Sequence, residues 1–488
     1  MRSRILTTVI GLVLGACLAA GAPSPAGAAS PAGASAPSLR VTSPQAFQVI
    51  QRDADGRADI VVRGVSRGLG DRVQASWASG PWRSGMVSGD GTYVVRLRGC
   101  APGQGTLEVR SAARPSVSVW ISYVGVGDIF VVAGQSNASG RGSQPSVYTG
   151  AVIRAGLFGN DDRWKDLRDP VDSAVGQVDK VSADVHAAGS VWPLVATGLV
   201  AADPVPVAFV PCARSTTSIA RWMRSVDRPY SRTTLYGSMM RRVRAVGGKV
   251  RAVLFWQGEA DARAGLTRAD YEAALRLLAG QIEQDCGAPL VAAQIGDFDM
   301  RYPADSVDGI RLAQEDLWKE GVVIPGPVLY DIDLRGRVHF TQPREQEVAA
   351  LRWTAAILGG VDKLNVPTGP TLVGAAYDGA GIVTLRFDCG RGGLRPGAVG
   401  GFVVKTPDGE QVGYRDALVT ASDTVSIDLQ TYPSEPLTVS LGSGREAAGC
   451  IVPMEDSQWS LPALPFVDVP VRMPDGPSAA APRESAAA

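Results

Sequence analysis

Residues 127–137 of this chain read Gly-Asp-Ile-Phe-Val-Val-Ala-Gly-Gln-Ser-Asn, and this stretch decides the fold. The run 128–132 is mostly apolar, which is typical of a strand that is buried on both faces of a sheet. A small residue and a glycine follow, and then three polar residues, Gln135, Ser136 and Asn137. The stretch therefore predicts a buried central strand that ends at a set of polar side chains.

Similar apolar runs recur after this strand, and helical patterns lie between them. The runs occupy residues 206–210, 252–256, 290–293 and 328–330. The helical patterns cover residues 192–202, 236–246, 267–284, 305–320 and 343–358. This alternation predicts a doubly wound, parallel α/β sheet over residues 125–362. Such sheets carry their sites at the carboxyl ends of the strands.

Both flanks of the α/β segment show patterns of β structure. Residues 38–124 contain short β-branched or alternating runs, such as 92–97, and Gly and Pro turns separate them. Residues 366–470 contain similar runs, and Asp408-Gly409 is a hairpin signal. We expect an N-terminal β-sandwich and a C-terminal all-β domain, one on each side of the α/β domain. Residues 471–488 are rich in Pro, Ser and Ala, and we expect a disordered tail there.

The N-terminus has the parts of an export signal. Arg2 and Arg4 precede an apolar stretch, and a small-x-small pattern ends at Ala28. The apolar stretch is shorter than the ~20 residues that span a bilayer. We therefore expect residues 1–28 to be a signal peptide and residues 29–37 to be an Ala/Pro-rich linker.

Export places the mature protein outside the cytoplasm, so we expect it to be secreted, with no integral membrane segment. An alternative is a lipoprotein signal, because residues 14–17 resemble a lipobox. In that case a lipid on Cys17 would anchor the protein at the cell surface.

Composition excludes several classes of function. Lys and Arg together number 48, as do Asp and Glu, so the formal net charge is zero. This balance gives no general attraction to nucleic acid or to an acidic membrane. His186 and His339 are the only histidines, which argues against a multi-histidine metal site. We expect no metal and no organic cofactor, and the sequence leaves the oligomeric state open.

The cysteines allow a limited disulfide prediction. Export permits disulfides, and five cysteines remain when Cys17 is set aside, an odd number. Cys389 and Cys450 lie in the same C-terminal segment, and we expect them to pair. Pairing of Cys212 with Cys286 is doubtful, because these residues are expected at opposite edges of the sheet.

Polar residues at three strand ends indicate a candidate site for acyl chemistry. The first strand ends at Ser136, the second at residues 211–216, and the third at residues 256–261. A serine hydroxyl becomes a nucleophile only with a nearby base, and His339 is the best candidate base near neutral pH. Polar groups at the other two strand ends could stabilise an oxyanion.

These motifs resemble one family. Gly134-Gln135-Ser136-Asn137, the run Trp256-Gln257-Gly258-Glu259-x-Asp261 and the late His339 are similar to the sialate O-acetylesterase branch of the SGNH, or GDSL-type, hydrolases. That branch is related to carbohydrate acetylesterases, including some acetyl xylan esterases. The resemblance is densest over residues 125–360. It implies an SGNH/flavodoxin-like sheet with a β domain on each side.

The resemblance also implies roles for individual residues. The family's nucleophile corresponds to Ser136 and its base to His339. Its oxyanion donors correspond to the N–H of Ser136, to the region of Ser215 and Thr216, and to Gln257. The family often has two glycines where Ser215 and Thr216 stand. The identity of the oxyanion donor at this second strand end, residues 211–216, is therefore left open.

The acid of the catalytic triad departs from the family pattern more than Ser215 and Thr216 do. Such enzymes usually carry Asp three residues before the histidine, and this chain has Gly336 there. Asp333 is our first choice for the acid, and Asp331 and Glu259 are alternatives, although we expect Glu259 to brace the strand end. A backbone carbonyl that orients the imidazole of a Ser–His dyad is a further alternative.

The expected function is a secreted carbohydrate O-acetylesterase. Its substrate would be O-acetylated sialic acid or a similar sugar, and it would act through an acyl-enzyme on Ser136. An acetyl xylan or other polysaccharide esterase is one alternative. A catalytically decayed extracellular glycan-binding protein is another, and the departure at Gly336 favours it.

Overall fold

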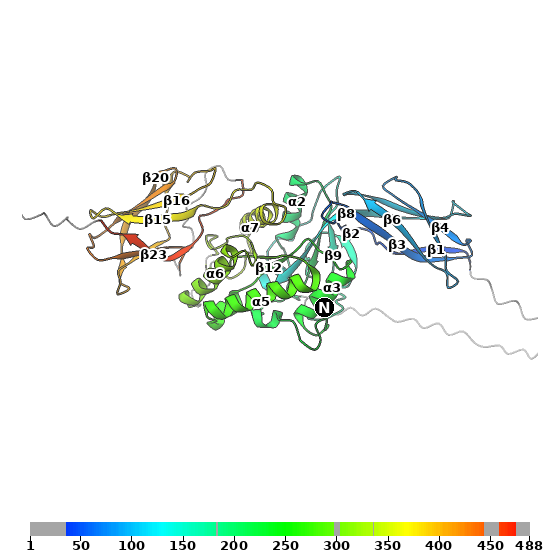
Figure 1. Ribbon diagram of the computed structural model, residues 1–488, viewed down its shortest axis with the longest axis horizontal. Helices are drawn as coiled ribbons and strands as arrows, with labels where there is room; N and C mark the ends of the chain where they lie inside the picture. The colour runs from blue at the N-terminus through cyan, green and yellow to red at the C-terminus, as the bar shows by residue number, and fades with distance from the viewer. Residues whose placement is uncertain (1–35, 182–183, 297–302, 335, 444–457, 475–488) are drawn as a thin grey trace, which may run out of the picture.

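The computed structural model describes residues 36–181, 184–296, 303–334, 336–443 and 458–474. Three regions follow one another along the long axis of the molecule, and the α/β region lies between two β-rich regions (Figure 1). The predicted signal peptide, most of the predicted linker and the tail beyond residue 474 lie outside the described residues. Among the described residues, no helix is both long and apolar enough to cross a membrane.

A largely parallel sheet forms the centre of the α/β region. Its strand order is β10-β9-β11-β8-β12-β13-β14, and all neighbours are parallel except the edge pair β10 and β9. The earliest of these strands in the sequence, β8, therefore lies between β11 and β12. The strands are β8 (Ser118–Gly134), β9 (Gly156–Phe158), β10 (Trp164–Asp166), β11 (Val207–Pro211), β12 (Ala252–Trp256), β13 (Leu290–Ala292) and β14 (Ile324–Pro325).

The last strand differs from the sequence prediction. The run 328–330 is irregular, and the strand lies earlier, at Ile324–Pro325. Pro325 is the last residue of this edge strand and Pro327 follows it closely, and a proline has no N–H to donate to a sheet ladder, so the ladder does not continue to residue 328. The apolar residues Leu329 and Tyr330 are nevertheless fully buried, in agreement with their apolar character.

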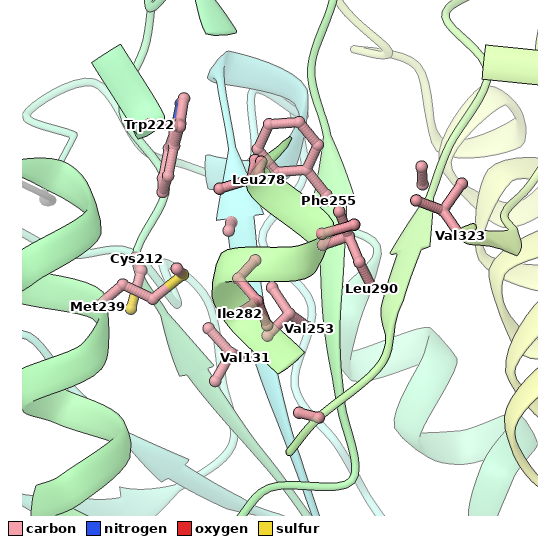
Figure 2. Close-up of a cluster of buried hydrophobic side chains, with 14 of the residues drawn as sticks. Val131, Cys212, Trp222, Met239, Val253, Phe255, Leu278, Ile282, Leu290 and Val323 are labelled. Atoms are coloured by element: carbon pink, nitrogen blue, oxygen red, sulfur yellow. The ribbon is translucent and has the colours of Figure 1, made fainter. Parts of the chain in front are cut away.

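Helices cover both faces of the sheet, which confirms the mixed α/β prediction. Ile129 and Val131 of β8 belong to one core, with residues of α3, α5 and α6, and Figure 2 shows part of this core. Phe130 and Val132 belong to the other core, with residues of α2 and α7. The helices are α1 (Ser136–Ser139), α2 (Trp192–Ala202), α3 (Leu235–Ala245), α4 (Glu259–Ala264), α5 (Arg268–Cys286), α6 (Ala304–Lys319) and α7 (Pro343–Ala356), with short turns η1 (Ile219–Trp222) and η2 (Ile357–Val361).

The N-terminal region contains two small sheets around an apolar core. One sheet has the order β1-β3-β6, and the other joins β5, β4, β7 and β8, with β2 also on β8. Strand β8 is 17 residues long, so it runs through the predicted boundary at residues 124 and 125 and serves both regions. The strands are β1 (Ser38–Ser43), β2 (Val49–Gln51), β3 (Ala58–Arg67), β4 (Arg72–Trp77), β5 (Arg83–Met86), β6 (Thr92–Cys100) and β7 (Gly103–Ser111).

The C-terminal region is a curled, all-β sheet with its own core. Its strand order is β17-β20-β21-β16-β15-β23-β22-β18-β19, and its last strand ends at Arg472, two residues beyond the predicted limit. The strands are β15 (Thr371–Tyr377), β16 (Ile382–Asp388), β17 (Gly397–Ala398), β18 (Phe402–Lys405), β19 (Gln411–Val412), β20 (Tyr414–Ala421), β21 (Thr424–Leu429), β22 (Leu437–Leu441) and β23 (Phe466–Arg472).

Side-chain hydrogen bonds join the C-terminal region to the α/β region. Arg311 donates to the carbonyl of Gly442 at 2.8 Å, and the hydroxyl of Tyr330 donates to that of Ala463 at 2.9 Å. Arg352 donates to the carbonyl of Ser460 at 2.8 Å. The contact therefore rests on buried side chains of the α/β region.

The disulfide prediction falls partly outside the described residues. Cys389 is buried and is bonded to no other cysteine among the described residues, and its Sγ lies 3.7 Å from the carbonyl oxygen of Ser422. Its expected partner, Cys450, lies outside the described residues, so the pairing stays a prediction. Cys212 and Cys286 are both free thiols.

Candidate active site

Ser136 is the first residue of α1, and only Gln135 separates it from the end of β8. The turn between them depends on Gly134, whose φ is +124° and whose added Cβ would lie 2.1 Å from the Trp256 carbonyl oxygen. A side chain therefore has no room at this position. Gln135 then fixes the turn, because its N–H donates to the Trp256 carbonyl at 2.9 Å and its side chain accepts from the N–H of Ala260 at 3.1 Å.

The sequence-predicted nucleophile and base lie together. The Ser136 Oγ is 2.9 Å from the His339 Nε2, within hydrogen-bond range. Burial lowers the pKa of His339, and the charge of Arg141 lowers it further, whereas Asp184 acts in the opposite direction. A lowered pKa keeps the imidazole neutral, and so able to accept a proton, at neutral pH.

The residue after the nucleophile also reaches the histidine segment. The Asn137 Nδ2 donates to Glu259 Oε1 at 2.8 Å and to the Val338 carbonyl at 3.2 Å. Its Oδ1 accepts from the N–H of Phe340 at 3.4 Å. Glu259 opens α4 and thus braces this strand end, as we expected from the sequence.

Glu259 is buried, and its ionisation reflects that burial. Burial raises the pKa of Glu259 to about 7, although its own backbone N–H and Asn137 oppose the shift. The nearby charge of Asp261 raises it further. The second carboxyl oxygen, Oε2, is buried with no hydrogen-bond partner among the described residues. Glu259 is therefore largely protonated below neutral pH.

The structure does not bring Asp333 to the imidazole. Asp333 is exposed, and its charge acts on Arg337 in the same loop. Asp331 is also unsuitable as the acid, because both of its oxygens bind the buried Arg352, at 2.5 and 2.7 Å. Among the described residues, no carboxylate hydrogen-bonds to His339 Nδ1. The physical reason is that Gly336, which occupies the usual position of the acid, provides no side chain.

An ion pair, Arg141 with Asp184, lies beside Ser136 and His339. Arg141 donates to Asp184 at 2.8 Å and also to the hydroxyl of Ser215, which in turn donates to Asp184. Burial acts to raise the pKa of Asp184, but the bonds from Ser215 and from the N–H of His186 outweigh it, and the pKa is lowered. Asp184 is therefore a carboxylate at neutral pH, and Ser215 is fixed by its side chain.

Backbone contacts place Arg141 between the site's loops. The N–H of Gly142 donates to the carbonyl of Gly189 at 2.7 Å, on the side of Asp184. The N–H of Ser143 donates to the carbonyl of Thr341 at 2.8 Å, on the side of His339. The segment of Arg141 thus joins the Asp184 loop to the histidine loop.

Gln257 occupies a different role from the predicted one. Its side chain is fully buried, and its Nε2 donates to the Thr217 carbonyl at 2.9 Å and to Asp261. An amide nitrogen has two protons, so these bonds use both, and Gln257 has no donor left for an oxyanion. Instead Gln257 holds the segment that follows β11, at Thr217. Asp261 holds the same segment, because it accepts from the N–H of Ile219 at 2.9 Å.

The backbone supplies the available donors near Ser136. Among the described residues, the N–H groups of Ser136, Ser215 and Thr216 have no hydrogen-bond acceptor. Thr216 has a φ of +60°, which is rare for a β-branched residue and marks a strained loop. Such a loop at a strand end is a suitable place for backbone N–H groups that face a reacting oxygen.

Sequence reasoning missed three residues of the site. Asn137 stands inside the recognised motif, and its position beside the nucleophile was a usable signal. Arg141 and Asp184 lie in an irregular segment between β8 and α2, where periodicity gives no information. Among the described residues, no group of three or more His, Cys, Asp or Glu is placed to hold a metal ion.

Comparison with known proteins agrees with the motif resemblance. Residues 126–351 match the sequence family described as carbohydrate esterase, sialic acid-specific acetylesterase. A probable carbohydrate esterase of Arabidopsis thaliana is 28% identical over 182 residues, which is 33% of this chain and 60% of that protein. The alignment thus spans about three fifths of that relative's length. The resemblance of the α/β region to the sialate O-acetylesterase-like branch is confirmed.

Solved structures extend the likeness to most of the chain. A carbohydrate acetylesterase from Xanthomonas citri matches with a TM-score of 0.59 and 20% identity, over 88% of this chain and 99% of that one. This match shows a shared fold. A crystal structure of an Arabidopsis thaliana protein matches over 48% of this chain and 98% of that one, at 20% identity, with a TM-score of 0.38.

Proposed function

We propose that this protein is a carbohydrate O-acetylesterase that forms an acyl-enzyme on Ser136. The observation that carries the proposal is the 2.9 Å distance between Ser136 Oγ and His339 Nε2 at the carboxyl end of β8. The sequence family matched by residues 126–351 supports ester hydrolysis on a sugar. The fold shared with a carbohydrate acetylesterase is consistent with it.

The reaction follows from the roles of the two side chains. Ser136 Oγ attacks the acetyl carbonyl while His339 Nε2 takes its proton, and the N–H groups of Ser136 and of the Ser215–Thr216 loop stabilise the oxyanion. His339 then protonates the leaving sugar oxygen. Water, activated by the same imidazole, attacks the acyl-enzyme and releases acetate. Neither step requires a group that these residues lack.

O-acetylated sialic acid is the substrate we propose first, because the matched family is described as sialic acid-specific. Acetyl xylan or another acetylated polysaccharide is the next substrate class to test. We also propose that the protein acts outside the cytoplasm. This second proposal rests on the charged, apolar and small-residue segments of residues 1–28.

The absence of a carboxylate on Nδ1 of His339, within the described residues, favours one rival. A decayed hydrolase that binds acetylated glycans without cleaving them would keep the fold and lose turnover.

The deciding experiment measures acetate release from an aryl acetate, O-acetylated sialic acid and acetylated xylan. The protein is compared with Ser136→Ala and His339→Ala, and a fluorophosphonate probe followed by peptide mass spectrometry locates the reactive serine. We expect each variant to lose at least ~10³-fold in kcat/KM and the probe to label Ser136. Turnover that survives in Ser136→Ala would rule out the mechanism. A folded, inert protein that binds the glycans would support the rival.

A further inference from the structure

The carboxylate that usually orients the catalytic histidine of a triad is not found at His339 among the described residues. In a Ser–His–Asp triad the carboxylate holds the imidazole through Nδ1. Here Gly336 stands at the acid's usual position, and no carboxylate bonds to Nδ1 of His339 among the described residues. The imidazole nevertheless lies 2.9 Å from the nucleophile, so another group must fix it.

Asn137 makes the contacts that such a group requires. Its Nδ2 lies 3.2 Å from the carbonyl oxygen of Val338, and its Oδ1 lies 3.4 Å from the N–H of Phe340. These two backbone groups flank His339 on both sides in the chain. One side chain, on the residue next to the nucleophile, therefore holds the backbone of the base at two points.

Glu259 fixes the orientation of that amide. Its Oε1 accepts from Asn137 Nδ2 at 2.8 Å, and Glu259 is 1% exposed. An acceptor at this point directs the nitrogen of the amide toward Glu259 and Val338, which leaves the oxygen for Phe340. This geometry suits asparagine at position 137, because its amide offers both a donor and an acceptor. Aspartate would lack the donor, and leucine would lack both.

Aromatic packing also holds the segment of residues 338–340 that contains His339. The ring of Phe340 meets Trp256 edge-on, with centroids 5.2 Å apart, and Trp256 is fully buried. Aromatic pairs in this arrangement are stabilised beyond the effect of their buried area. Phe340 is thereby fixed at its ring by Trp256 and at its N–H by Asn137.

We propose that Asn137, oriented by Glu259, is a positioning residue of His339 and serves in place of the missing triad carboxylate. It acts on the backbone of the histidine and not on its ring nitrogen. This inference rests on the proposed Ser136–His339 mechanism. It adds that the dyad is assembled by a side chain of the nucleophile's own segment.

The test is a double-mutant cycle between Asn137 and His339, read with an aryl acetate. We expect Asn137→Ala to lower kcat by ~10²-fold, with KM changed less than about 3-fold, because a displaced base loses its alignment. In His339→Ala, free imidazole supplies a base that does not depend on the histidine loop. We therefore expect Asn137→Ala to cost less than about 3-fold in that background.

Two further variants keep the test decisive if Asn137→Ala folds poorly. Asn137→Asp retains the acceptor for Phe340 and removes the donors, so it should also lose kcat by at least ~10-fold. Glu259→Gln retains a carbonyl oxygen for Asn137 and should keep kcat within ~10-fold. Tyr236→Phe is the control, because it removes only the hydrogen bonds of a hydroxyl to the Gln281 carbonyl and to Asp285, none of which involves a residue of the site, and it should leave kcat unchanged.

The outcomes separate the inference from the function on which it rests. Costs of Asn137→Ala and His339→Ala that multiply would show that Asn137 acts independently of the histidine, and the inference would be wrong while the esterase stands. Full kcat in Asn137→Ala would overturn it in the same way. Full activity in His339→Ala without imidazole would instead overturn the proposed dyad.

Discussion

The two sides of the candidate site are built by different means. On the nucleophile side, β8 lies between β11 and β12, and the turn at Gly134 sits against the Trp256 carbonyl of the neighbouring strand. On the base side, His339 lies in an irregular segment between β14 and α7, and side chains hold that segment. The sheet thus places the serine, whereas amide and guanidinium groups place the histidine.

This difference predicts how substitutions on the nucleophile side and on the base side of the site act. A strand end inside a parallel sheet tolerates little change in backbone position, because ladders on both sides fix it. A loop held by Asn137 and Arg352 depends on single polar groups, each of which can be removed. Damage to the first half should therefore appear as a loss of folding, and damage to the second as a graded loss of stability or rate.

The largest expected effect is on the nucleophile side. Gly134→Ala would place a Cβ 2.1 Å from the Trp256 oxygen at a φ of +124°, so β8 and β12 must separate. We expect a loss of about 4–6 kcal/mol in unfolding free energy, or no soluble protein, measured by urea denaturation. Gly280→Ala is the matched control, because its added Cβ meets no atom within 4 Å. Equal stability of the two variants would contradict the view that the sheet fixes the serine.

The next effect falls on the base side. Arg352 binds Asp331, and both side chains are 2% exposed, so Arg352→Met leaves a buried carboxylate unpaired. We expect a loss of about 3–5 kcal/mol in unfolding free energy. Adding Asp331→Leu should restore at least half of that loss, because the orphaned charge is then gone. A double variant as unstable as Arg352→Met would show that the bond to Ser460 dominates.

A smaller effect concerns the pH dependence of stability. Burial raises the pKa of Glu259 from 4.5 to about 7, so the folded protein favours the protonated acid. This stabilisation is fully present below pH ~4.5 and is lost as the pH rises through about 7, up to roughly 3 kcal/mol in all. Urea denaturation across this range should show the decline in the native protein and a flatter profile in Glu259→Gln. Parallel profiles would mean that folding does not shift the pKa of Glu259.

The smallest effect distinguishes two carboxylates beside the histidine loop. Asp184 raises the pKa of His339, so Asp184→Asn should lower it further. Because the neutral imidazole is the active form, the acid limb of kcat/KM should move to lower pH, by less than about 1 unit. Asp333→Asn serves as the control and should leave the limb in place. A shift in Asp333→Asn alone would restore Asp333 as the acid.

The same contrast explains what the sequence could predict. Local apolar runs and turn residues predict the first four buried strands of the parallel sheet and the serine at the end of β8, and the structure has them. The fifth predicted strand, at residues 328–330, is displaced to Ile324–Pro325. The support of the histidine depends on groups far apart in sequence, such as Asn137 with Phe340 or Arg141 with Asp184, which no local pattern reveals. Gln257 illustrates the limit, because its motif gave its position but not the two acceptors that occupy its amide.

Strand β8 also has a consequence for biosynthesis. Its first half pairs with β7, which has already left the ribosome when β8 appears, so the sandwich can close at once. Its second half, Asp128 to Gly134, must wait for Val207–Pro211 and then for Ala252–Trp256 before both of its edges are paired. During that interval an apolar strand stands with open edges, a state that invites aggregation.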